Sequence, residues 1–263
     1  CQGGAADYVR ERGEKEETTM IHTAHAILTG QGGRRINEDW AGVTELPGGG
    51  LTAVVADGLG GHEGGQIASE TAGKEFLRFL SSAALCPDAA LLEKAAFRAN
   101  EAVLDLQTQE YRMMSTLAGF MLTDRQARWV HVGDSRIYHF HNGILSGRTL
   151  DHSVSQMAVA MGMIDESQIR FHEDRSRLLR ALGSDTFEPE VSGPVPLDRG
   201  YHSFLLCSDG FWEYVIEEEM EAALAGCGTP GEWLSRMEKL LRERASANSD
   251  NYTAAAIFAL DHP

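Results

Sequence analysis

The chain has few of the features that mark membrane or nucleic-acid-binding proteins. No apolar run approaches the roughly 20 residues that a membrane-spanning helix needs, and no basic-then-apolar segment resembles a secretory signal. Basic residues are scarce: 23 Lys and Arg stand against 39 Asp and Glu, for a formal net charge of -16. Such a charge repels phosphate backbones. We therefore expect a cytoplasmic protein with no membrane span and no nucleic-acid partner.

Cysteine is also scarce. The four cysteines lie far apart and form no CxxC pair, whereas a disulfide framework or a structural zinc site needs closer groups. We interpret them as reduced core or surface thiols. Residues 1–20 are polar and charged with little periodicity, and we expect a disordered tail or remnant there. Residues 21–263 show no linker, which favours a single domain.

Apolar patterns predict a mixture of strands and helices. Short apolar runs bounded by turn signals predict strands at 51–56, 118–122, 128–132, 137–140, 203–207 and 254–260. Hairpins adjacent in sequence favour antiparallel sheets. Apolar stripes at helical spacing predict helices over 68–80 and 92–106, and the pair Thr229-Pro230 predicts the start of a third helix that reaches Leu241. Together these elements predict an α+β layered domain.

The most informative stretch runs from Asp57 to Gly65. An acidic residue ends a buried strand there, and five glycines follow within eight residues. An aspartate on a rigid strand end can bridge cations, while the Gly58 carbonyl adds a hard oxygen ligand. The alternative is a glycine-rich loop capped by a surface aspartate. The stretch is not a phosphate-binding P-loop, because the Gly-Lys-Ser/Thr ending is absent.

Other carboxylates lie beside predicted strand ends, and each taken alone is equally consistent with a turn cap or a surface charge cluster. They are the pair Glu38 and Asp39, then Asp134, Asp209 and Asp250. Arg34 or Arg35, just upstream of the pair, could hold a phosphate through bidentate hydrogen bonds. Strand-edge aspartates on a sheet-rich domain can converge at one rim. Ligands that are all oxygen favour Mg2+ or Mn2+ over Zn2+.

In their order along the chain, these motifs resemble the PPM family of metal-dependent protein phosphatases (the type 2C group), especially its compact bacterial members. The resemblance spans roughly residues 22–260. It rests on Arg34-x-x-Asn37-Glu38-Asp39, the Asp57 to Gly65 loop, Ser115-Thr116, Gly133-Asp134-Ser135-Arg136, Asp151-His152-Ser153, Arg180-Ala181-Leu182-Gly183, Ser208-Asp209-Gly210 and Asp250-Asn251-Tyr252-Thr253. One position departs from the pattern, since Ser115 stands where the family commonly has glycine.

The resemblance implies a four-layer α-β-β-α sandwich of two antiparallel sheets flanked by helices. It also implies two Mn2+ or Mg2+ ions in a cleft at one end of the sandwich, with a third ion in bacterial relatives. The implied ligands are Glu38, Asp57, the Gly58 carbonyl, Asp209 and Asp250 for the two ions, and Asp134 together with Asp209 for the third.

The implied reaction is hydrolysis of phosphoserine and phosphothreonine on proteins by a water shared between the ions, without a covalent intermediate. Arg34 would bind the substrate phosphate and Asp39 would orient the water. His62 would protonate the leaving group, because its ordinary pKa suits a general acid near neutral pH; a hydrogen bond within the glycine loop is its alternative role. The implied partners are phosphoprotein substrates of a cognate serine/threonine kinase.

Three further points stay open in the sequence. A pseudophosphatase that binds phosphoproteins without turnover predicts the loss of at least one ligand, and none is lost. A hydrolase of a small phosphorylated metabolite would share the same chemistry. Residues 156–176, with Met157, Met161 and Met163, occupy the variable flap of the family. We expect these methionines to lie in the core, with an adaptable binding surface as the alternative.

Overall fold

The structure is a computed structural model that describes residues 22–47, 49–60, 64–83, 88–108, 112–123, 126–197 and 200–260. The expected polar tail, residues 1–20, lies outside these described residues, and so does His62. Within the described part of the chain, no helix combines the length and the apolar character that crossing a bilayer requires.

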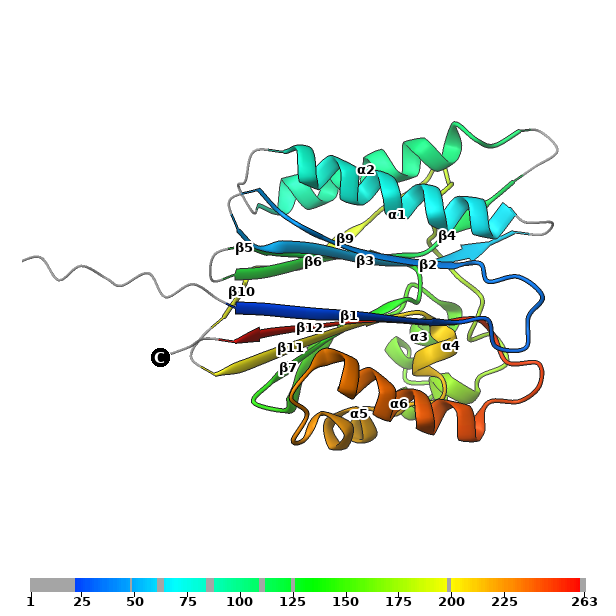
Figure 1. Cartoon of the computed structure of the whole chain (residues 1–263). Coiled ribbons are helices and arrows are strands. Elements are labelled where there is room, and N and C mark those ends of the chain that lie inside the picture. The colour runs from blue at the N-terminus through cyan, green and yellow to red at the C-terminus, as the bar shows by residue number, and fades with distance from the viewer. Residues whose placement is uncertain are drawn as a thin grey trace, which may run out of the picture.

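Two antiparallel sheets pack face to face as the inner layers of the molecule (Figure 1). The first sheet has the order β1 (His22–Gly30), β12 (Tyr252–Leu260), β11 (Tyr201–Cys207), β7 (Arg136–His141) and β8 (Ile144–Arg148). The second has the order β10 (Val195–Pro196), β6 (Gln126–Val132), β5 (Leu117–Thr123), β3 (Leu51–Leu59) and β2 (Asp39–Glu45), while β4 (Met114–Ser115) pairs with β3 and β9 (Glu190–Val191) pairs with β6. Phe120 and Phe204 meet between the sheets with ring centroids 4.7 Å apart.

Helices form the two outer layers (Figure 1). The helices α1 (Gly64–Ser82) and α2 (Ala89–Leu104) cover the second sheet, and α5 (Glu217–Leu224) and α6 (Pro230–Arg244) cover the first. Three short helical segments lie between strands: α3 (Val154–Ala160), the 3-10 helix η1 (Glu166–Phe171) and α4 (Asp209–Trp212). Apolar stripes drive this layering, because each helix buries one face against its sheet. The predicted four-layer α-β-β-α sandwich is confirmed.

The predicted helix start at Thr229 is also present, since its side chain accepts a hydrogen bond from the Glu232 N–H at 3.2 Å. The expectation that the flap methionines lie in the core is wrong. Met157, Met161 and Met163 are 40%, 65% and 73% exposed. The helix α3 is only seven residues long, buries a single side chain, Ser155, and packs against the core through the partly buried Val159 rather than through Met157.

Candidate metal centre

Strand pairing brings the first two carboxylates together. Asp39 at the start of β2 lies directly opposite Asp57 on β3 in the antiparallel register. Residues opposite each other in such a pair have Cβ atoms about 5 Å apart, on the same face of the sheet. Two like charges in that arrangement repel each other. The pairing of Asp39 with Asp57 is therefore typical of a site that holds cations.

Close backbone approach explains the glycine-rich stretch. A Cβ atom on Gly65 would lie 2.6 Å from Glu38 Oε1 and 2.7 Å from the Gly58 carbonyl oxygen, and one on Gly58 would lie 1.9 Å from the Gly65 carbonyl oxygen. The Gly58 N–H also donates to the Glu38 carbonyl at 3.1 Å. Only glycine allows the start of α1 to approach this closely. The contact keeps the Glu38 carboxylate beside the Gly58 carbonyl.

The other sheet contributes Asp209 and Asp250. Asp209 begins α4 immediately after β11, and Asp250 precedes β12 by two residues. Ser208 joins the two sheets at this point, because its hydroxyl donates to Asp39 Oδ2 at 2.7 Å while its N–H donates to the Thr253 carbonyl at 3.0 Å. The hydroxyl of Ser208 therefore holds one oxygen of Asp39, while the other, Oδ1, is buried without a hydrogen-bond partner.

Asn251 ties the segment before β2 to the segment before β12. Its Oδ1 accepts from the Glu38 N–H at 2.8 Å, and its Nδ2 donates to the carbonyls of Gln31 and Ile36 at 2.7 and 3.0 Å. These three bonds set Glu38 beside Asp250. The sequence places Asn251 in a motif without indicating this role, because its three partners lie 213 to 220 positions away.

The backbone of Asp57 is held by the Ser115-Thr116 pair. The Thr116 N–H donates to the Asp57 carbonyl at 2.8 Å, and the Asp57 N–H donates to Thr116 Oγ1 at 2.9 Å. The Ser115 hydroxyl adds a further bond to the Asp57 carbonyl at 3.0 Å. The serine that replaces the family's usual glycine thus contributes a contact to the ligand-bearing strand.

Burial and mutual repulsion shape the electrostatics of the cluster. Burial, followed by the charges of Asp39, Asp209, Asp134 and Asp250, raises the pKa of Asp57 well above its ordinary value. Burial likewise raises the pKa of Asp39 and of Asp209 to about 7. The pKa of Asp134 rises for the same reason, with the charge of Asp209 as its second cause. The acids at Asp39, Asp57, Asp134, Asp209 and Asp250 therefore lie close enough to influence one another's pKa values.

Burial also raises the pKa of Glu38, with the charge of Asp250 as the second cause. Two oxygen atoms in the cluster, Asp39 Oδ1 and Asp209 Oδ1, are buried without a hydrogen-bond partner. A buried carboxylate oxygen that lacks a partner is costly. A hard divalent cation would satisfy such atoms and offset the repulsion among the acids. The residues present therefore fit Mg2+ or Mn2+.

Arg34 lies at the rim of this cluster. Its Nη2 contacts Asp250 Oδ2 at 2.7 Å, and the two side chains are 56% and 41% exposed. Arg35 is exposed as well, but it makes no ion pair among the described residues. The geometry therefore favours Arg34 over Arg35 as the phosphate-binding arginine.

Asp134 lies between β6 and β7 and is 4% exposed. Gly133, just before it, has a φ of +96°. His152 holds both polar groups of the Gly133 backbone. Its main-chain N–H donates to the Gly133 carbonyl at 2.8 Å, and its ring Nδ1 accepts from the Gly133 N–H at 3.3 Å. His152, His131 and Glu190 also form a group of close ligand-type atoms. The two imidazole rings stack with planes 13° apart. The lone pair of an imidazole nitrogen lies in the plane of its ring, so two stacked rings do not point their lone pairs at one common ion. We therefore assign this group to support of Gly133 and not to metal binding.

The fold and the carboxylate cluster define a class of protein, an α+β sandwich with an oxygen-lined site for divalent cations, and comparison with known proteins gives the family. Residues 32–252 match the family model described as Protein phosphatase 2C. The serine/threonine phosphatase stp of Listeria monocytogenes is 34% identical over 208 residues, which cover 73% of this chain and 78% of that protein.

Solved structures agree with this assignment. The crystal structure of the Mycobacterium tuberculosis serine/threonine phosphatase PstP/Ppp is similar with a TM-score of 0.79 and 27% identity, covering 92% of this chain and 100% of that one. A structure of the PstP catalytic domain in complex with two manganese ions has the same TM-score and coverage at 25% identity. The chain belongs to the protein phosphatase 2C family.

Proposed function

We propose that the protein hydrolyses phosphoserine and phosphothreonine on proteins in a reaction that depends on Mn2+ or Mg2+. The observation that carries the proposal is the gathering of acids from distant segments at one edge of the sandwich, with raised pKa values and two buried oxygens that lack partners. The two manganese ions in the PstP structure support the same reading.

The chain would hold two ions. The proposed ligands are Glu38, Asp57, the Gly58 carbonyl, Asp209 and Asp250, with Asp134 and Asp209 available to a third ion. When bound, such ions supply Lewis acidity, which activates water near neutral pH and offsets the charge of a phosphate. No residue of the chain needs to form a covalent bond to phosphorus. Cys207 is the cysteine nearest in sequence to Asp209, and it is a poor nucleophile because burial strongly raises the pKa of its thiol.

The remaining roles fall to residues around the acids. Asp39 keeps one carboxylate oxygen on Ser208 and can use the other to orient the attacking water. Arg34 can exchange Asp250 for the substrate phosphate, because both side chains are exposed. His62 lies outside the described residues and stays our predicted proton donor to the leaving alkoxide. We further propose that the substrates are the phosphoproteins of a cognate serine/threonine kinase in the cytoplasm.

A phosphopeptide-hydrolysis assay with and without Mn2+ tests this function. We expect activity to require the metal and to fall at least about a hundredfold in Asp57→Asn and Asp209→Asn, since metal activation contributes several kcal/mol to such reactions. Asp105→Asn is the matched control, because Asp105 is exposed at the end of α2. Circular dichroism should show all three variants folded.

The same assay separates the alternatives. Turnover that persists in EDTA would exclude the metal mechanism. Phosphopeptide binding without turnover in the Mn2+-loaded parent would indicate a binding module instead of an enzyme. Turnover of small phosphate esters with no turnover of phosphopeptides would assign the chain to small metabolites.

A further inference from the structure

One side chain links the two segments that carry Asp134 and Asp209. The helix α4 begins at Asp209 and ends at Trp212, and the indole N–H of Trp212 donates to the Asp134 carbonyl at 2.9 Å. Trp212 is 1% exposed. It therefore connects the loop between β6 and β7 directly to the end of α4 through a rigid ring.

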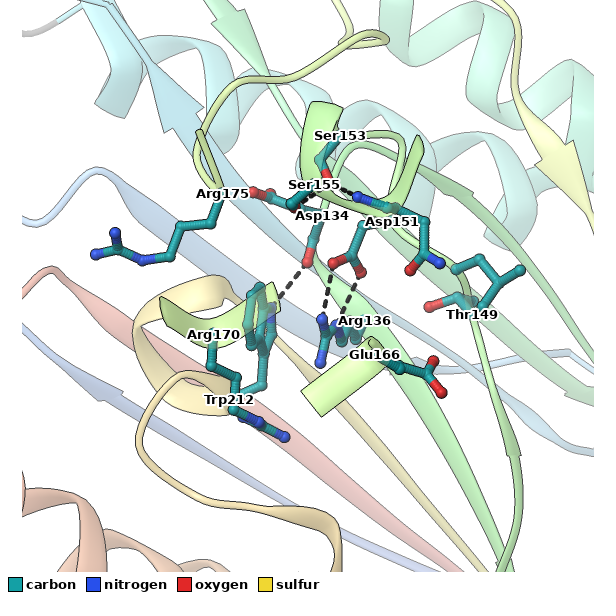
Figure 2. A network of polar contacts seen from close by, with 12 residues as sticks. Asp134, Arg136, Thr149, Asp151, Ser153, Ser155, Glu166, Arg170, Arg175 and Trp212 are labelled. Carbon is teal, nitrogen blue, oxygen red and sulfur yellow. Dashed lines mark hydrogen bonds and ion pairs between the residues drawn. The ribbon is translucent and has the colours of Figure 1, made fainter. Parts of the chain in front are cut away.

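The indole N–H lies at the edge of the ring, and a buried ion pair packs on the face of the ring (Figure 2). The Arg136 guanidinium carbon lies 3.5 Å from the centroid of the Trp212 ring. Arg136 also donates two hydrogen bonds to Asp151, from Nε at 2.8 Å and from Nη2 at 2.7 Å, and both side chains are almost fully buried. A planar guanidinium that is bonded at its edge and stacked on its face has little freedom to move. The Trp212 indole is held in turn by its stack on this guanidinium and by its hydrogen bond to the Asp134 carbonyl.

The Arg136–Asp151 pair is linked to the Asp134 loop by a second contact, through His152. Asp151 is followed directly by His152, which bonds both sides of Gly133. The residue before Asp134 and the carbonyl of Asp134 itself are therefore both anchored to the Arg136–Asp151 pair, one through His152 and the other through Trp212. Such anchoring is useful here because two neighbouring carboxylates repel each other when both are ionised.

We propose that Trp212 is a positioning residue that, braced by Arg136 and Asp151, sets the separation between the Asp134 and Asp209 carboxylates and so tunes the affinity of the metal position they share. The inference rests on the proposed function, in which both aspartates are ligands. The indole of Trp212 offers no metal-ligating atom, and it acts through the backbone of Asp134. Supports of this kind typically change metal affinity about 10- to 100-fold when removed.

The chain contains a matched control for the test. Trp233 is buried in the same hydrophobic core as Trp212, and its indole N–H donates at the same distance of 2.9 Å, but its acceptor is the Met220 carbonyl on α5, which belongs to no candidate ligand. Trp212→Phe and Trp233→Phe therefore delete the same bond at similar burial. Mn2+ binding is measured by titration calorimetry, and the Mn2+ concentration for half-maximal phosphopeptide hydrolysis is measured in parallel.

We expect Trp212→Phe to weaken the weakest Mn2+ binding event and to raise the half-activating Mn2+ concentration about 10-fold or more, with activity recovering at high Mn2+. Trp233→Phe should lower thermal stability without moving either metal value. In an Asp134→Asn background, Trp212→Phe should cause no further loss of Mn2+ affinity, because the residue through which it acts is already changed.

The outcomes distinguish the two proposals. Equal metal affinities in Trp212→Phe and Trp233→Phe, with a parent that binds Mn2+, would reduce Trp212 to a packing residue and leave the proposed function intact. A parent that binds no Mn2+ would remove the proposed function itself. If circular dichroism shows Trp212→Phe unfolded, the comparison is made with Arg136→Lys, which keeps the charge opposite Asp151 and removes the planar stack on the indole.

Discussion

At the scale of single residues, Arg34 differs from the acids it faces because it is exposed and can change its partner. Its ion pair with Asp250 joins two side chains that are 56% and 41% exposed. Exposed ion pairs contribute between about 0 and 1 kcal/mol to stability. A phosphate monoester offers the same guanidinium two or more oxygens in a bidentate arrangement. The contact with substrate should therefore matter more than the contact with Asp250.

Arg34→Lys is expected to lower kcat/KM for a phosphopeptide about 10- to 100-fold, since a bidentate charge-assisted contact contributes about 1.5–3 kcal/mol. The melting temperature should change little. Arg35→Lys is the matched control, because Arg35 is an adjacent, exposed arginine without an ion pair to a described residue. An equal loss in both variants would show that general positive charge, and not the contact of Arg34, binds the phosphate.

The supports around the acids could not be predicted from the sequence, although the acids themselves could. Glu38 and Asn251 are 213 positions apart, Asp39 and Ser208 are 169 apart, and Asp57 and Thr116 are 59 apart. An aspartate that ends an apolar run carries its own local signal. A hydroxyl or amide that bonds such a residue from a distant segment carries a signal only once the fold has placed it there.

At the scale of elements, burial decided which strands could be predicted. The strands β3, β5, β11 and β12 are buried along most of their length, so each appears as a continuous apolar run. The strand β1 is mostly exposed, and β2 is half-buried and begins with the acids of the site. Neither produces an apolar run or a clear alternation. Both were missed for that reason, and the register that pairs Asp39 with Asp57 was missed with them.

The start of α1 carries a prediction of its own. A Cβ on Gly65 would lie 2.6 Å from Glu38 Oε1 and 2.7 Å from the Gly58 carbonyl oxygen. We expect Gly65→Ala to destabilise the fold by about 1–3 kcal/mol, because the backbone must shift, and to weaken Mn2+ binding by displacing Glu38. Denaturant unfolding and titration calorimetry measure the two effects.

Gly231 supplies the control, because it is the second residue of α6 as Gly65 is of α1. A Cβ there would meet only the Ala26 Cβ at 3.8 Å, an ordinary contact. Gly231→Ala should be neutral or stabilising by up to about 1 kcal/mol and leave Mn2+ binding unchanged. If Gly65→Ala behaves like Gly231→Ala, close approach at Gly65 does not shape the site.

At the scale of the whole molecule, the site works against the stability of the metal-free fold. Five acids in the cluster have raised pKa values, namely Glu38, Asp39, Asp57, Asp134 and Asp209. A folded-state pKa above the unfolded value means that the folded state binds more protons, so stability is greatest at low pH and is lost as pH rises through the folded pKa. For Asp39 and Asp209 that pKa is about 7.

Buried histidines act in the opposite direction at lower pH, and His131, whose pKa is lowered by burial, is one of them. Burial lowers the pKa of His139 and His152 to about 4, so the unfolded state binds more protons between about pH 4 and the ordinary histidine pKa of 6.5. Stability from these groups is lost as pH falls through that window. Between about pH 6.5 and 7.5 the remaining protonation of the unfolded-state histidines partly offsets the effect of the acids, and above about pH 7.5 the acids alone determine the trend.

We therefore expect the metal-free protein to melt at a lower temperature at pH 8 than at pH 6.5, with each of Asp39 and Asp209 contributing at most about 1.4 kcal/mol per pH unit. Mn2+ at 100 times its dissociation constant should add about 2.7 kcal/mol and remove the downward trend, because the ions compete with the protons.

Asp57→Asn should raise the metal-free melting temperature at pH 8, since it removes one of the repelling charges, whereas Asp105→Asn should not. Thermal melts in EDTA and in Mn2+ across this range check each expectation. A metal-free melting temperature that rises from pH 6.5 to 8 would mean that the acids are not crowded together in solution, because crowded carboxylates must lose stability as they ionise.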